Sequence, residues 1–81
     1  MPGYSRTTSE CLSRMGLRAA DLERFVGLEL SEAERLARSM GLTIFEWIVD
    51  GQPRNRVWIL MCTWLSVEVR GGRIERVVGL G

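Results

Sequence analysis

Apolar residues at helical spacing predict one clear helix in the middle of the chain. They recur at intervals of three and four residues, as Ala33, Leu36, Ala37 and Met40. Ser31 and Glu34 have the spacing of a capping box, which satisfies free amide groups at the start of a helix. Gly41 is suited to the left-handed conformation that often ends one. The pattern therefore predicts a helix over residues 30–40.

Beyond this helix the spacing changes to the alternation that is typical of β-strands. Residues 43–49 are rich in β-branched and aromatic side chains and predict a first strand, followed by a turn at 50–53. A second strand alternates strictly, with Leu65, Val67 and Val69 facing inward and Ser66 and Glu68 facing outward. The Gly-Gly pair at 71–72 predicts a hairpin turn, so residues 74–80 form the last strand.

The first third of the chain has shorter patterns. Ser9 can cap a short helix that ends near Met15, and residues 19–25 can form another helical turn. The order of these elements indicates a single α+β domain. In that domain one main helix packs on a small mixed or antiparallel sheet.

Residues 52–64 form either a long loop or a strand, and they contain most of the apolar run 57–65. As a strand, the run is buried in an antiparallel meander or against a second copy, since 81 residues offer little protein to cover two faces. As a loop, it is exposed and binds a partner. Spanning a bilayer takes about 20 apolar residues. We therefore expect no membrane association.

Charge and composition exclude several classes of function. Eleven Lys and Arg residues face ten Asp and Glu residues, which gives a net charge of +1. A nucleic-acid-binding domain usually has a larger basic excess, so Arg54 and Arg56 beside Trp58 indicate a solvated loop, and no nucleic acid is expected. The chain has no His, which excludes His-based catalytic triads and His-containing zinc sites.

The remaining residues offer little catalytic chemistry. No nucleophile stands beside a recognisable base, and no glycine-rich phosphate loop is present, so we expect no enzyme and no cofactor. Cys11 and Cys62 are too few for a four-sulfur metal site. They are also far apart in sequence, so we expect free, partly buried thiols in a reducing compartment. No signal peptide is visible at the N-terminus, which makes a cytoplasmic location the default expectation.

Three segments in this order, FVGL at 25–28, DGQP at 50–53 and LSVEVRGGRI at 65–74, resemble the potato inhibitor I type of serine-protease inhibitor. The small inhibitors of bacteria are the most similar branch, and RVVGLG at 76–81 also resembles the family's C-terminus. The resemblance covers about residues 25–81. It therefore implies that residues 25–81 form a single inhibitor-like α+β domain and that residues 1–24 are an N-terminal extension. It implies one helix on a mixed sheet, and a long loop between two strands that enters a protease active site as a substrate does.

The resemblance places this loop at about residues 52–64 and makes Trp58 the specificity residue. A large aromatic side chain there suits the pocket of a chymotrypsin-like or subtilisin-like protease. The sequence departs from the family on both sides of this position. The family has Thr before the specificity residue and an acid after it, whereas this chain has Val57 and Ile59.

The family's two loop-bracing arginines fall on Met61 and Trp64, and neither can donate a charge-assisted hydrogen bond. We predict a non-enzymatic protein-binding module that presents residues 54–64 to a partner protein, for which a serine protease is one candidate. The alternative is a homo-oligomeric interaction or scaffold protein in which residues 57–65 form a buried interface strand and no protease is inhibited. The expected partner-binding residues are Arg54, Arg56, Val57, Trp58, Ile59, Leu60 and Trp64.

Overall fold

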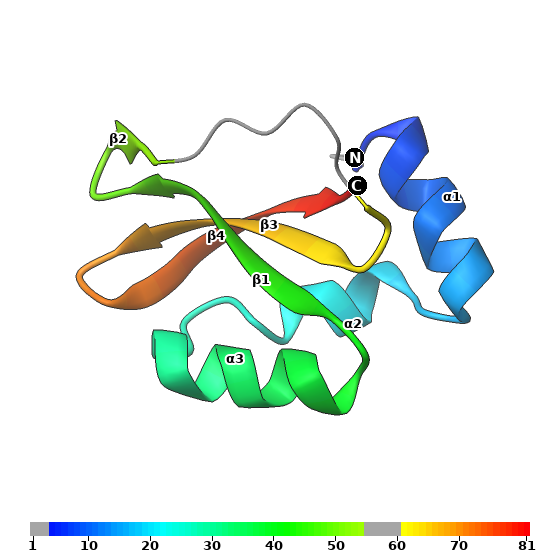
Figure 1. Ribbon diagram of the computed structural model, residues 1–81, viewed down its shortest axis with the longest axis horizontal. Helices are drawn as coiled ribbons and strands as arrows, with labels where there is room; N and C mark the ends of the chain where they lie inside the picture. Colours follow the sequence, from blue (N-terminus) through cyan, green and yellow to red (C-terminus); the bar gives the residue numbers. More distant parts are fainter. Residues whose placement is uncertain (1–3, 55–60) are drawn as a thin grey trace.

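A computed structural model describes residues 4–54 and 61–81. Within these ranges the chain forms three helices and a four-stranded sheet (Figure 1). The helices are α1 (Arg6–Met15), α2 (Ala19–Glu23) and α3 (Leu30–Ser39). The strands are β1 (Thr43–Val49), β2 (Gln52–Pro53), β3 (Trp64–Arg70) and β4 (Arg73–Leu80). The predicted α+β class is therefore confirmed.

The sheet is mixed, with the strand order β2-β1-β3-β4. Strands β1 and β3 are parallel, with Thr43 opposite Trp64 and Val49 opposite Val69, while the other two pairings are antiparallel. An antiparallel meander from β1 into β3 is therefore wrong. The alternation of inward and outward side chains along a strand is the same whether its neighbour is parallel or antiparallel, so it could not distinguish the two. In the observed parallel pair, the chain must return to the starting end of β1 before it enters β3.

Two tight turns meet at one end of the sheet. Asp50 and Gly51 have φ angles of 50° and 80°, and the Gly71-Gly72 turn has φ angles of 60° and 78°. Both turns have positive φ at both central residues, as two-residue hairpins prefer. Asp50 Oδ1 also accepts a hydrogen bond from the Gly71 N–H group at 2.9 Å, which joins the two hairpins.

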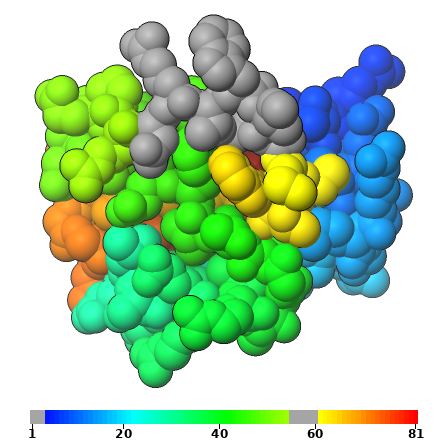
Figure 2. All heavy atoms as spheres, viewed as in Figure 1, coloured from blue at the N-terminus to red at the C-terminus, as the bar shows by residue number. Residues whose placement is uncertain are grey.

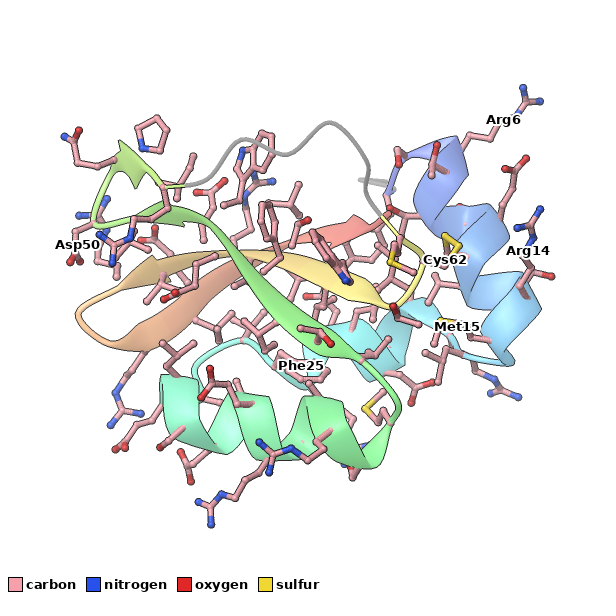
Figure 3. The ribbon with its side chains drawn as sticks, in the orientation of Figure 1. Arg6, Arg14, Met15, Phe25, Asp50 and Cys62 are labelled. Atoms are coloured by element: carbon pink, nitrogen blue, oxygen red, sulfur yellow. A yellow bond between two sulfur atoms is a disulfide. The ribbon has the colours of Figure 1, made fainter. Side chains whose placement is uncertain are left out.

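The core lies between the helices and one face of the sheet, with Phe25 placed between α3 and the strands (Figure 3). The inward-facing residues predicted for β3 are confirmed: Leu65, Val67 and Val69 are all buried. Ser66 was expected on the opposite, outward face, yet it is only 5% exposed. That second face of the sheet is therefore covered at Ser66.

The helix predicted over residues 30–40 is confirmed as α3, but its cap is different. The Glu32 side chain accepts from the Glu29 N–H group at 3.2 Å, whereas the sequence favoured Ser31 and Glu34 for this role. A tertiary contact favours the cap at Glu29, because the Leu30 N–H group next to it donates to the Gly72 carbonyl oxygen at 2.9 Å.

Helix α1 also starts earlier than predicted. Ser5 caps it by accepting from the Thr8 N–H group at 3.2 Å, so the cap expected at Ser9 is wrong. The helix buries Thr8, Cys11 and Leu12 and contacts the end of β4. Figure 1 shows α1 standing beside the end of the sheet where β4 finishes.

Candidate functional site

Two of the expected partner-binding residues lie in the described part of the chain. Arg54 follows β2 and is exposed, and Trp64 is the first residue of β3 and is half-buried. The others lie outside the described residues: Arg56, Val57, Trp58, Ile59 and Leu60. The structure therefore describes the two ends of the candidate segment, which we define as residues 54–64.

The first end of the segment is held against β1. The Arg54 N–H group donates to the Trp47 carbonyl oxygen at 3.0 Å, directly after the β1–β2 hairpin. The register of β1 against β3 shifts at Trp47, so this residue forms a bulge. Its side chain is 38% exposed. The segment therefore begins beside an exposed tryptophan that is not among the expected partner-binding residues.

The second end of the segment is a turn that leads into β3. The Trp64 N–H group donates to the Met61 carbonyl oxygen at 2.8 Å, and the Thr43 N–H group donates to the Thr63 carbonyl oxygen at 2.7 Å. Met61 is 53% exposed. A buried strand through residues 57–65 is therefore wrong for 61–63, while residues 57–60 of that prediction lie outside the described part.

A disulfide between Cys11 and Cys62 joins this turn to α1 (Figure 3). The prediction of free thiols is wrong, and a reducing compartment is no longer indicated. Separation in sequence says little about distance in space: docking of α1 at the end of β4 brings Cys11 next to the turn. One feature that could have indicated a packed rather than a frayed helix is the position of Cys11 beside Leu12, both on the buried face of α1.

An aromatic cluster occupies the sheet face that points away from the core. The Phe45 and Trp64 rings stack at 5.4 Å between centroids, and the Trp47 ring lies 6.0 Å from the Phe45 ring at a tilt. Phe45 is opposite Ser66 in the register, and Ser66 points away from the inward-facing residues of β3. Trp64, which stands where the resemblance implies a bracing arginine, therefore contacts its surroundings by ring stacking.

A shallow hollow of about 290 Å³ lies between α3 and β1. Its lining residues are Glu34, Arg38, Leu42, Thr43 and Ile44. Figure 2 shows α3 and β1 next to each other on this side of the molecule. None of its lining residues belongs to the candidate segment.

Within residues 4–54 and 61–81, no group of three or more His, Cys, Asp or Glu side chains gathers as a metal would require. No helix in the same ranges is long and apolar enough to cross a membrane. Comparison with protein-family models, with curated proteins and with solved structures found no match to this chain. The resemblance to potato inhibitor I therefore stays a prediction that rests on the residues quoted above.

Proposed function

We propose that this protein is a non-enzymatic protein-binding module that presents residues 54–64 to a partner, as potato inhibitor I proteins present a loop to a serine protease. The observation that carries the proposal is the parallel pairing of β1 and β3. It requires residues 50–63 to run from the finishing end of β1 back to the starting end of β3. A long connection between two such strands is the feature that the resemblance assigns to the binding loop.

The described contacts at both ends of the segment support a binding role. The hydrogen bond from Arg54 to Trp47 holds its start, and the disulfide at Cys62 holds its finish. A segment whose ends are already fixed loses less conformational entropy when it binds than a free chain of the same length. The partner therefore gains affinity from restraint that exists before it arrives.

Restraint by the disulfide and by ring stacking also compensates for the missing arginines. In the family, charge-assisted hydrogen bonds stiffen the loop from the strand that follows it. Here Trp64 stacks on Phe45 instead, and Cys62, two residues earlier, is covalently bound to α1. We propose that these contacts do the bracing in this chain, and that Trp58 is the side chain that enters the partner's pocket.

The test is incubation of the protein with chymotrypsin and with subtilisin, in separate reactions, over a range of molar ratios. Residual protease activity and the masses of any fragments after reduction are measured together. We expect inhibition near equal ratio and slow cleavage after Trp58. Rapid cleavage within residues 57–64 without inhibition would contradict the inhibitor mechanism, because it would show an accessible segment that is not restrained.

Substitution of the specificity residue makes the test specific. Trp58→Ala is expected to abolish inhibition while leaving the urea midpoint of unfolding nearly unchanged. Val26→Ala is the matched control, since Val26 is an exposed apolar residue in the connection between α2 and α3. If Trp58→Ala instead lowers stability by about 3–5 kcal/mol, Trp58 is buried in a core or between copies, and the homo-oligomeric alternative replaces the proposal.

A further inference from the structure

The sheet has one edge that the rest of the described chain leaves without a partner. Strand β2 pairs with Ile48 and Val49 of β1, and the Arg54 N–H group bonds to Trp47, so the four residues of β1 before Trp47 form an edge. The Thr43 N–H group points toward the β3 side and bonds to Thr63, the residue before β3. Successive residues of a strand direct their backbone groups to opposite sides, so Ile44 and Glu46 direct theirs outward. No residue in 4–54 or 61–81 bonds to them.

The other edges of the same sheet are protected. Near its start, β4 is bonded to the preceding loop, since the Ile74 N–H group donates to the Leu28 carbonyl oxygen at 2.9 Å. Near its finish, Thr8 Oγ1 bonds to both backbone groups of Leu80. Strand β2 has two residues, one of which is Pro53. Natural sheets use these devices to prevent edge pairing. Among residues 4–54 and 61–81, none of these devices protects the outward groups of Ile44 and Glu46.

We propose that this edge of β1 is a self-association surface, on which a second copy of the chain pairs antiparallel to extend the sheet across a two-fold axis. Ile44 would pair with the partner's Glu46, and Glu46 with the partner's Ile44, which matches every outward N–H group to an outward carbonyl. The two-fold axis then passes beside Phe45. This register is self-complementary, as a two-fold interface requires.

The charges beside the edge favour a copy of the same chain over another peptide. Glu34 and Arg38 lie one turn apart on α3 and line the hollow next to Ile44. Neither belongs to an ion pair within the described ranges. A two-fold axis reverses the order of residues along α3, so Glu34 is presented toward the partner's Arg38 and Arg38 toward the partner's Glu34. Opposite charges that meet in this way select the register and the partner.

The test is sedimentation velocity on the full chain over protein concentrations up to the millimolar range. We expect a concentration-dependent dimer. Glu34→Arg and Arg38→Glu should each weaken it by about tenfold or more, because like charges then face each other. A mixture of the two variants should restore association, since unlike charges meet again. Arg35→Glu is the control, because Arg35 is on the same helix but does not line the hollow.

Amide hydrogen exchange of the unmodified protein provides a second readout that needs no substitution. The Ile44 and Glu46 amides should become protected as the concentration rises. A protein that is monomeric at all concentrations overturns the proposal. A dimer whose dissociation constant is unchanged by both charge reversals also overturns it. Protection of these two amides in a monomer, whether by the chain itself or by an added extended peptide, also overturns it. The outcome does not depend on protease binding, so this inference and the proposed function stand or fall separately.

Discussion

Thr8 is a buried side chain that serves as the hydrogen-bonding partner of a strand. Its hydroxyl accepts from the Leu80 N–H group and donates to the Leu80 carbonyl oxygen, both at 3.1 Å. Gly79 allows this close approach, because a Cβ atom there would collide with Thr8 Oγ1. At the scale of single residues, therefore, the contact of α1 with the end of β4 needs the Thr8 hydroxyl group and the absence of a side chain at Gly79.

Replacement of Thr8 by Val tests this contact, since valine has nearly the same shape and lacks the hydroxyl. We expect the free energy of unfolding to fall by about 1–3 kcal/mol, because two buried backbone groups of Leu80 lose their partner. Urea unfolding followed by circular dichroism measures the change. Thr7→Val is the matched control, since Thr7 is exposed, and it should stay within about 0.5 kcal/mol of the unmodified protein. Equal effects of the two substitutions would contradict the role of Thr8.

At the scale of elements, local patterns predicted most of the fold. Spacing and turn residues were sufficient for α3, for β1 and for the Gly71-Gly72 hairpin. They failed where distant parts of the chain decide the outcome. The start of α1 was predicted too late in the chain. The first buried residue of this helix is Thr8, which is polar and therefore does not appear in a pattern of apolar residues. The direction of β3 relative to β1 was left open because both directions bury the same alternate residues.

The disulfide is the strongest restraint on any single element. It closes a stretch with a sequence separation of 51, for which the chain-entropy account predicts a stabilisation of about 4 kcal/mol. We expect dithiothreitol to lower the urea midpoint of unfolding markedly. The double variant Cys11→Ala, Cys62→Ala is the control, and its midpoint should not respond to dithiothreitol. Detection of two free thiols in the unreduced, unfolded protein would show that the bond does not form.

At the scale of the whole molecule, the N-terminal residues are packed into the fold. Helix α1 covers the end of β4, Cys11 and Leu12 belong to the main core, and the Tyr4 hydroxyl bonds to the Glu23 carboxylate. An N-terminal extension over residues 1–24, as expected from the sequence, does not by itself indicate what these residues pack against. In this structure they pack on their own sheet, and they reach the candidate segment through Cys62.

A shortened chain that begins at Leu17 and carries Cys62→Ala tests this dependence. Removal of α1 exposes the finishing end of β4. It also leaves the N–H and carbonyl groups of Leu80 without their hydrogen-bond partner, the Thr8 hydroxyl. We expect unfolding at a much lower urea concentration than for the full-length Cys11→Ala, Cys62→Ala variant, which controls for the loss of the disulfide. An unchanged midpoint would show that residues 17–81 fold independently of α1.

The candidate site was less predictable than the fold. Sequence placed the segment between two strands and proposed Trp58 as its anchor, but pattern alone could not show what holds its ends. The bond from Arg54 to Trp47 depends on a bulge in β1, and the bond from Cys62 to Cys11 depends on the docking of α1. Both are long-range consequences of the assembled sheet, and no spacing within residues 52–64 encodes them.

The position of the disulfide has a consequence for a protease that does cut the segment. Cys11 precedes residues 54–61 and Cys62 follows them, so hydrolysis of one peptide bond in between yields two chains that stay covalently linked. The product gains the mass of one water molecule and migrates as one species until it is reduced. The paired strands β1 and β3 still connect the two pieces. Cleavage would therefore leave a single molecule, which separates into two pieces only after both reduction and unfolding.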